Sequence, residues 1–259
     1  SLVQLAQPEF EIHFPTACRD AHLARLSAAT DLLHPEPIAD LHDSDAEALL
    51  SNVDILVTGW KSRPIDAELR RRMPRLKLVA HLAGTVKGIL DRDAASSGLT
   101  VISGAEANAR PVAEFTLAHI LLHLKRVEEW RRVYRSQRSR IATRSTALAG
   151  PVGNTGRVVG IIGASRIGRR VAEDLRRYRV SVLLHDPFVS AEAAAEFCAR
   201  KVSMDDLLTQ SDVVSLHQPL LPTTERSFGA SEFARMRDGA LLINTARGRI
   251  IDAQALEAA

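Results

Sequence analysis

The sequence is poor in cysteine and aromatic residues and lacks any long hydrophobic run. Only two cysteines, Cys18 and Cys198, occur among 259 residues, and their separation matches no metal-binding spacing. A disulfide-built domain and a structural zinc site therefore have no support, and no metal site is expected. No apolar stretch approaches the roughly 20 residues of a membrane-spanning helix, and no secretory signal opens the chain. We expect a cytoplasmic protein without a membrane partner.

Positive and negative charges nearly balance, at a net +3, and the basic excess is concentrated in one segment. Residues 125–144, KRVEEWRRVYRSQRSRIATR, hold eight basic and two acidic side chains around Trp130 and Tyr134. Such a stripe is typical of a nucleic-acid surface, and equally of a solvated helix face that leads into a polar linker. Because the rest of the sequence shows no motif that reads nucleic acid, nucleic acid is not expected as a partner.

Short apolar strands alternate with amphipathic helical patterns along the chain, which predicts βαβ units and parallel sheets. Helical spacing is clear over 166–178, and a longer apolar helix over 111–130 begins with a proline in its first turn. With 46% hydrophobic residues, the chain is expected to form two α/β lobes, Rossmann-like or flavodoxin-like, each with its own core. The predicted strands cover 78–82, 99–102, 158–162, 180–184, 213–216 and 240–243.

A domain boundary is predicted near Asn108, because the helix over 111–130 is long enough to bridge two lobes. This boundary gives a first domain over 1–108 and a second over 109–259. The chain opens on SLVQLAQ, a helix-like pattern, and closes on ALEAA inside another helix, so we expect elements to be missing at each terminus. Candidate helix N-caps are Ser203, Ser231 and Asp252.

A glycine turn after the strand 158–162 is the first candidate site. Gly163, Ser165 and Gly168 occupy the three positions of a GxGxxG turn, and Asp186 follows about 20 residues later, after the next strand. Such a turn holds a pyrophosphate on helix N-terminal amides, while the acid accepts ribose hydroxyls and repels a 2′-phosphate, which favours NAD over NADP. The alternative is tight strand-to-helix packing alone. The β-carbon of Ser165 crowds the approach of the phosphate.

A second candidate site lies in LLINTARGRIID, residues 241–252, where a buried strand ends at Asn244 and Arg247 follows in the turn. That turn falls at the carboxyl edge of the sheet, where ligands bind in open α/β folds. An arginine holds a carboxylate through two parallel hydrogen bonds and polarises a neighbouring carbonyl. The alternative is a surface arginine without a ligand.

The chain resembles the D-isomer-specific 2-hydroxyacid dehydrogenases, a family that includes phosphoglycerate dehydrogenase. Four segments carry the resemblance, in this order: VGIIGASRIGRRVA, LLHDPF, DVVSLHQPLLPTTER and MRDGALLINTARGRIID. It extends less specifically through PRLKLVAHLAG and covers about residues 50–259. The resemblance implies an interrupted substrate domain, a nucleotide domain, and hydride transfer between NAD and a small 2-hydroxy acid. It also implies a small carboxylate substrate and a homodimer.

The resemblance assigns roles to particular residues. Arg247 matches the family's catalytic arginine, which binds the substrate carboxylate. Asn108 matches a residue at the lobe junction, and the backbone amides of Gly84, Thr85 and Val86 are in place to cradle a carboxylate, as amide-lined turns do. The cofactor-binding residues that it implies are Gly163, Ser165, Arg166, Ile167, Gly168, Asp186, Pro219, Thr224, Thr245 and Ala246.

The sequence departs from the family's pattern in three places. The family's acid/base histidine and glutamate fall beyond Ala259, so the chain lacks this proton-relay segment; His217, in SLHQPL, is interpreted as structural. Lys87 stands near an acidic position of the substrate loop. Thr58 stands where many phosphoglycerate enzymes have an arginine, so a phosphorylated substrate is not expected.

Two points stay open at the level of the sequence. Trp60, after the strand pattern DILVTGW, either lines the substrate pocket or merely packs. The fold also serves a second kind of function, that of a catalytically weak NAD(H)-sensing interaction protein, and the basic segment 125–144 suits that role. Fold-level analogy does not name the substrate.

Overall fold

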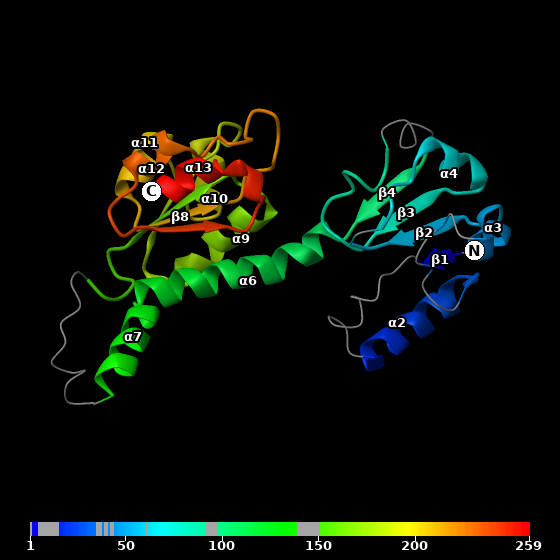
Figure 1. The fold of residues 1–259 in the computed structure, drawn as a ribbon, viewed down its shortest axis with the longest axis horizontal. Coiled ribbons are helices and arrows are strands. Elements are labelled where there is room, and N and C mark those ends of the chain that lie inside the picture. Colours follow the sequence, from blue (N-terminus) through cyan, green and yellow to red (C-terminus); the bar gives the residue numbers. More distant parts are fainter. Residues whose placement is uncertain are drawn as a thin grey trace. The chain divides into compact units, whose positions relative to one another are not determined.

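The computed structural model describes residues 2–4, 16–34, 38, 41, 44–60, 62–91, 98–138 and 151–259. The chain divides into two compact units, residues 1–108 and residues 109–259. Each unit is built on its own parallel sheet with helices packed against it (Figure 1). None of the helices among the described residues is long and apolar enough to span a bilayer.

The first unit holds a four-stranded sheet in the order β1-β2-β3-β4, and all its strand pairs are parallel. The strands are β1 (Leu2–Gln4), β2 (Ile55–Thr58), β3 (Leu78–His81) and β4 (Thr100–Ser103). The helices are α2 (Thr16–Ala29), α3 (Ser44–Leu50) and α4 (Ala67–Arg72). A core cluster joins the last two helices to β2 and β3 through Ala46, Leu50, Leu56, Leu69 and Val79.

The second unit holds a five-stranded parallel sheet in the order β7-β6-β5-β8-β9. The strands are β5 (Val158–Ile162), β6 (Ser181–His185), β7 (Arg200–Lys201), β8 (Val213–Leu216) and β9 (Leu241–Asn244). The α-helices are α6 (Ala105–Leu124), α7 (Val127–Gln137), α9 (Arg166–Leu175), α10 (Ala191–Glu196), α11 (Met204–Gln210), α12 (Ala230–Arg235) and α13 (Ala253–Ala258). Two 3₁₀ turns, η1 (Arg176–Tyr178) and η2 (Gly248–Ile250), complete it.

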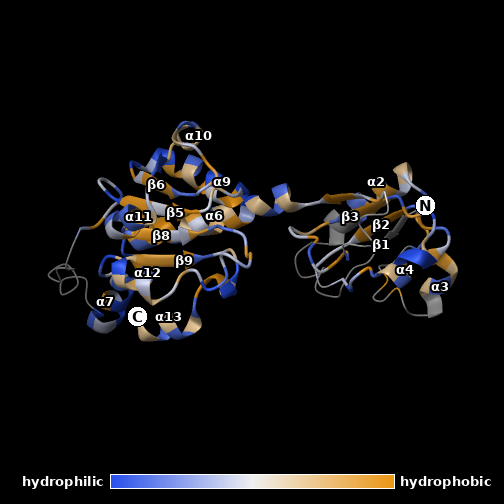
Figure 2. Cartoon of the chain, turned by 90° about the horizontal axis from the view of Figure 1, so that it is seen from above, coloured by the Kyte–Doolittle hydropathy of each residue, from blue (hydrophilic) through white to orange (hydrophobic). Residues whose placement is uncertain are grey.

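Helices cover both faces of the second sheet, and its central strands β5 and β8 are mostly apolar (Figure 2). Val159 and Ile161 of β5 pack on one face, in a cluster with α6, α9 and α10. Ile162 packs on the other face, with α11 and Phe228. A parallel sheet buried on both faces requires this near-continuous hydrophobicity.

Asp212 fastens the amino-terminal edge of the second sheet. Its carboxylate forms ion pairs with Arg157, at an N–O distance of 2.7 Å, and with Arg237, at 3.2 Å. It also accepts a hydrogen bond from the backbone N–H of Val158. Asp212 therefore ties the entries of β5, β8 and β9 together, at the edge opposite the strand ends discussed below.

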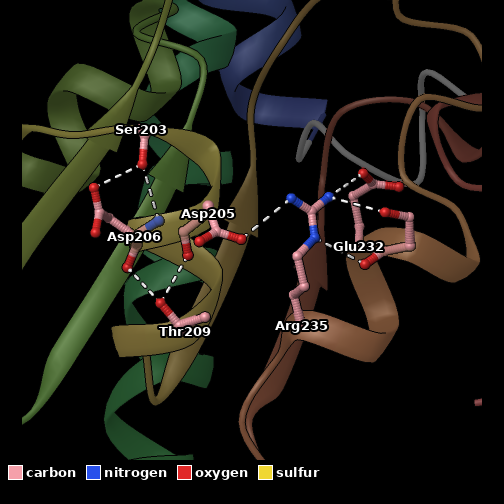
Figure 3. A network of polar contacts seen from close by, with 7 residues as sticks. Ser203, Asp205, Asp206, Thr209, Glu232 and Arg235 are labelled. Atoms are coloured by element: carbon pink, nitrogen blue, oxygen red, sulfur yellow. Dashed lines mark hydrogen bonds and ion pairs between the residues drawn. The ribbon is translucent and has the colours of Figure 1, made fainter.

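A surface network links α11 to α12 (Figure 3). Ser203 caps α11, since its Oγ accepts from the N–H of Asp206, and Thr209 donates to the Asp205 carbonyl. Arg235 of α12 contacts Asp205 at 3.5 Å and Glu232 at 2.6 Å. Exposed pairs of this kind contribute little to stability, so the network orders the surface more than it holds the fold.

Most predicted strands are confirmed. Those over 158–162 and 213–216 are confirmed to the residue, and the other four lie within one residue of their predicted starts. The helix over 166–178 is confirmed, with its last turn in 3₁₀ form. Ser203 and Asp252 are confirmed as N-caps.

Three local predictions are wrong: the bounds of the helix over 111–130, the N-cap at Ser231 and the helical opening segment. The helix expected over 111–130 begins earlier, at Ala105, because alanine-rich residues extend it ahead of Pro111, and it ends at Leu124. Arg126 then adopts a left-handed backbone with φ 56° and separates α6 from α7. Ser231 lies inside α12 instead of capping it; Gly229 holds the N-cap, and its N–H donates to Glu232.

The opening segment was expected to be helical, and its described part, Leu2–Gln4, forms strand β1 instead. Backbone pairing of Leu2 with Ile55 of β2 overrides the helix-like pattern of these few residues. Of the basic segment 125–144, α7 covers residues through Gln137, and residues 139–144 lie outside the described part of the chain.

Candidate functional site

Four strands of the second sheet end in register at its carboxyl edge. Ile162 of β5 pairs with His185 of β6 and with Leu216 of β8, and Leu216 pairs with Asn244 of β9. The four residues that directly follow these strand ends therefore lie in a line along the edge. In order across the sheet, these residues are Asp186, Gly163, His217 and Thr245.

The turn from β5 into α9 is built on close backbone contacts. Gly163 has φ +95°, and a Cβ there would lie 2.6 Å from the backbone N of Gln218. A Cβ on Gly168 would overlap the carbonyl oxygen of Gly163 and lie 3.3 Å from the Cβ of His217. Both glycines are therefore required by the packing of the turn, whatever binds there.

Ser165 is the N-cap of α9. Its Oγ accepts a hydrogen bond from the N–H of Gly168 at 3.3 Å. Ile167 packs against the core of the unit, and Arg166 is exposed at the first position of the helix. The serine at the middle position of the turn thus serves the helix, because a hydroxyl there satisfies one of the first-turn amides.

Asp186 holds the glycine turn against the end of β6. One carboxylate oxygen accepts from the N–H of Ala164 and the other from the N–H of Phe188, both at 2.8 Å. Each carboxylate oxygen has two lone pairs. The residue therefore fastens the turn and still has capacity to accept a hydroxyl from a ligand.

Pro219 and Thr224 come together in the loop after β8. Thr224 Oγ1 donates to the carbonyl of Pro219 at 2.6 Å, and it accepts from the N–H of Leu221 at 2.8 Å. The side chain of Thr224 therefore closes this loop by bonding to its own backbone.

Thr245, Ala246 and Arg247 form the turn after β9, and Asn244 braces them. Its Oδ1 accepts from the N–H of Ala246 at 3.0 Å, and its Nδ2 donates to the carbonyl of Arg247 at 2.9 Å. Thr245 Oγ1 lies 3.4 Å from the hydroxyl of buried Thr116 on α6. Arg247 is exposed, with Nη1 donating to the Ala246 carbonyl. The backbone of Arg247 is therefore held in place by Asn244, while its guanidinium is exposed to solvent.

His217 lies beneath the glycine turn and is only 3% exposed. Its Nε2 hydrogen-bonds Ser215 Oγ at 2.8 Å, and its Nδ1 has no partner among the described residues. Burial lowers the pKa of this imidazole to about 4, so the ring is neutral at physiological pH. Because the ring is buried, it is not accessible to take a proton from a bound ligand. This agrees with the interpretation of His217 as structural.

The candidate substrate residues lie in the first unit. The loop after β3 carries Gly84, Thr85 and Val86, and a Cβ on Gly84 would lie 3.4 Å from the side-chain nitrogen of Asn108. The structure thus brings Gly84 and Asn108 together. Trp60, at the end of β2, is half exposed at 49%.

Sequence reasoning missed the side chains that support these turns. Asn244 was predicted only as a strand end, and Arg169, whose Nε donates to the Ala164 carbonyl at 3.0 Å, was not singled out. Thr116, Ser215 and His81 are polar residues at buried positions. That was the one sign of them in the sequence, because the partners of Thr116 and His81 lie far away along the chain and only the fold brings them together.

Comparison with known families and proteins gives a consistent result. Residues 117–259, more than half of the chain, match the family described as "D-isomer specific 2-hydroxyacid dehydrogenase, NAD binding domain". A D-3-phosphoglycerate dehydrogenase of Mycobacterium leprae is 33% identical over 193 residues, which is 74% of this chain and 35% of that protein. A glyoxylate reductase of Aeropyrum pernix is 34% identical over 229 residues, 87% of this chain and 66% of that protein.

Solved structures agree with these sequence relatives. A D-lactate dehydrogenase from Aquifex aeolicus, described as complexed with NAD and lactic acid, matches with a TM-score of 0.70 and 26% identity. The match covers 99% of this chain and 72% of that one. The chain spans less than two thirds of the two curated relatives named above.

Replacing Gly168 with alanine is expected to disrupt the turn, because the new Cβ overlaps the Gly163 carbonyl. We expect the free energy of unfolding to fall by about 2 kcal/mol, as overpacking does, and the Kd for NADH to rise about tenfold. Urea unfolding and NADH fluorescence titration measure the two effects. Gly229→Ala is the control, since a Cβ at that position meets nothing closer than 3.8 Å. Unchanged NADH affinity in Gly168→Ala would contradict a role of this turn in binding.

The pH dependence of stability is expected to report the buried His217. The unfolded chain protonates this residue near pH 6.5 and the folded protein only near pH 4, so folding loses stability as the pH falls through that window. From pH 7 to pH 5 the free energy of unfolding should drop by about 2 kcal/mol more in the wild type than in His217→Gln. Urea unfolding at both pH values measures this difference. The control is His119→Gln, at an exposed histidine. An equal drop in the free energy of unfolding of the wild type and of His217→Gln would contradict the assignment of this pH dependence to His217.

Proposed function

Because the chain belongs to the family of D-isomer-specific 2-hydroxyacid dehydrogenases, we propose that it transfers a hydride between NAD and a small 2-hydroxy acid. The observation that carries the proposal is the line of residues along the carboxyl edge of the second sheet. Asp186, the glycine turn and the Thr245–Arg247 turn follow strands whose ends are in register. In open α/β sheets, ligands bind outside this edge.

The residues at this edge fit a dinucleotide. Gly163 and Gly168 allow β5 to turn tightly into α9, and the N-terminus of α9 that follows is the kind of group that binds a pyrophosphate. Asp186 is placed to accept ribose hydroxyls with its remaining lone pairs, and its charge opposes a 2′-phosphate. We assign Ser165, Arg166 and Ile167 to the pyrophosphate side, and Pro219, Thr224, Thr245 and Ala246 to the rest of the cofactor. NAD supplies the hydride acceptor, or NADH the donor, when bound.

Arg247 is proposed to bind the substrate carboxylate. Its strand, β9, lies two strands from β5, which is about 10 Å at the usual spacing. The guanidinium is therefore well separated from the pyrophosphate turn and lies toward the reactive end of a dinucleotide that crosses the edge from β6. Its planar fork holds the carboxylate and polarises the adjacent carbonyl without changing protonation. In the first unit, we assign the amides of Gly84, Thr85 and Val86 and the side chain of Asn108 to the binding of a carboxylate substrate.

The first test is NADH oxidation by the whole protein with glyoxylate, pyruvate and a bulkier 2-keto acid, alongside NADH binding by fluorescence. Turnover with any of these acids supports the dehydrogenase. Binding of NADH without turnover supports instead a protein that senses NAD(H), and absence of NADH binding contradicts both.

Arg247→Gln should lower kcat/KM for the best 2-keto acid about a hundredfold, because removing one partner of a hydrogen-bonded charge pair formed with the substrate costs roughly 3 kcal/mol. The Kd for NADH should stay within about twofold of the wild-type value, since the guanidinium is assigned to the substrate. Steady-state kinetics and fluorescence titration separate the two. Arg249→Gln, a neighbouring exposed arginine paired with Glu225, is the matched control. An equal loss in both variants would contradict the assignment.

We further propose that the chain forms a homodimer through α6 and α7. Large apolar side chains on these consecutive helices are exposed, namely Phe115, Leu122, Val127 and Tyr134, and α7 has no buried residue. A two-fold interface buries the same patch on both copies. Sedimentation should give twice the chain mass of 28.3 kDa for the wild type and the monomer mass for the double variant Leu122→Asp, Tyr134→Glu. Phe188→Ser, at a 93% exposed position that belongs to neither helix, should remain dimeric; a monomeric wild type would overturn the proposal.

A further inference from the structure

Four consecutive peptide units form the turn from β5 into α9, and each has a hydrogen-bond partner. The N–H of Gly163 donates to the last carbonyl of β6 at 3.0 Å, and the N–H of Ala164 donates to the Asp186 carboxylate at 2.8 Å. The carbonyl of Ser165 accepts from the N–H of Arg169 at 3.0 Å. The remaining unit joins Ala164 to Ser165, and its carbonyl accepts from Arg169 Nε at 3.0 Å. Among the residues that the structure describes, this side chain is the one hydrogen-bond partner of that unit.

Two contacts hold the guanidinium of Arg169 in place. Its Cζ lies 5.1 Å from the centroid of the Phe197 ring, which is a cation–π contact, and its Nε makes the bond to Ala164. Phe197 directly follows α10, is 3% exposed and belongs to the core of the unit. The side chain reaches from the fourth position of α9 back toward the start of the helix, the direction in which helical side chains lean. Arg169 therefore links the glycine turn to the core beside α10.

The direction of the Ala164 carbonyl also sets the direction of the next N–H. In a planar trans peptide the C=O and the N–H point in opposite directions. Because the Ala164 carbonyl points to Arg169, the N–H of Ser165 points away from Arg169. This N–H has no acceptor among the described residues. An amide without an acceptor at the start of a helix is available to an anion.

We propose that Arg169 is a positioning residue for NAD, which turns the N–H of Ser165 toward the pyrophosphate through its bond to the Ala164 carbonyl. The place of the pyrophosphate at this turn rests on the proposed function; the bond from Arg169 to the turn does not. An amide that is already oriented loses less entropy on binding than one that must be ordered first. Arg169 is assigned no contact with the cofactor, so it acts through the direction of a backbone group and not through its charge.

Three replacements of Arg169 separate position from charge. Arg169→Met removes both the bond and the charge, and should raise the Kd for NADH about fivefold, as the loss of one hydrogen bond does. Arg169→Lys keeps the charge, but its nitrogen lies one bond further along the side chain and it lacks the planar group. Arg169→Gln loses the charge and keeps an N–H donor at the same distance along the side chain as Nε.

Fluorescence titration of NADH ranks these variants. The Kd of Arg169→Lys should lie within about twofold of the Arg169→Met value, and that of Arg169→Gln within about twofold of the wild type. All of these residue types favour a helix to a similar degree, so α9 should form in each variant, which urea unfolding checks. An unchanged Kd in Arg169→Met would overturn the proposal, as would wild-type affinity in Arg169→Lys together with weak binding in Arg169→Gln.

Salt gives an independent test, because it screens the attraction between charges and does not change the direction of an amide. The Kd ratio of Arg169→Met to the wild type should be the same at about 0.05 M and about 0.5 M NaCl. A ratio that falls toward one at high salt would overturn the proposal, since Arg169 would then attract the phosphates directly. Arg177→Met is the matched control, because Arg177 is an exposed arginine in the 3₁₀ turn that follows α9. It should keep the wild-type Kd, and a rise equal to that of Arg169→Met would contradict the assignment.

Phe197→Leu tests the contact that holds the guanidinium. It removes the aromatic ring and keeps an apolar side chain in the core. The Kd for NADH should rise about threefold in the wild-type background and much less in the Arg169→Met background, because residues that act as a unit are not additive. An equal rise in both backgrounds would overturn the role of the ring.

Kinetics separate this inference from the proposed function. In Arg169→Met, KM for NADH should rise about fivefold with the Kd, while kcat and KM for the best 2-keto acid stay within about twofold of the wild-type values. A wild type that binds NADH without turnover would overturn the proposed hydride transfer, and the Kd series would still decide the role of Arg169. A wild type that does not bind NADH would overturn both.

Discussion

The parallel pairing of every strand in both sheets is the constraint from which the rest of the structure follows. Parallel strands all deliver their following loops to the same edge. In the second unit, the register of β6, β5, β8 and β9 places an acid, a glycine turn, a histidine and an arginine-bearing turn side by side. The site is thus assembled by topology, and its residues are separated by up to 84 positions along the chain, from Gly163 to Arg247.

The same pairing divides the chemistry of the second unit between its two edges. At the amino-terminal edge, the Asp212 carboxylate pairs with both Arg157 and Arg237 and accepts a hydrogen bond from the Val158 N–H, so charged groups there hold the strand entries together. At the carboxyl edge, Ser165, Thr224 and Asn244 hold their turns through neutral hydrogen bonds to backbone groups, and the Asp186 carboxylate accepts from backbone N–H groups of the glycine turn and of its own loop. This leaves the Arg247 guanidinium outward-facing, because no carboxylate is needed to fix its backbone.

The sequence allowed much of the second sheet and its edge to be predicted, because those signals are local. Continuous apolar runs marked β5 and β8, and a turn that cannot accept a Cβ must show glycine at Gly163 and Gly168. The predictions that failed concern features that depend on contacts between residues far apart in the sequence, or on small differences in energy. Strand β1 exists only through pairing with β2, the start of α6 was hidden by Pro111, and the partners of Asn244 and His81 are defined by the folded turn and sheet.

Each unit keeps a neutral histidine beneath the turn assigned to an anion, with a hydroxyl as its partner: Thr58 for His81 and Ser215 for His217. Burial lowers the pKa of both imidazoles, so neither contributes a positive charge near neutral pH. Under the proposed function, the attraction for anions comes from backbone amides, the dipole of α9 and Arg247, none of which titrates in that range. We therefore expect the affinity for a carboxylate and a pyrophosphate to stay constant across physiological pH.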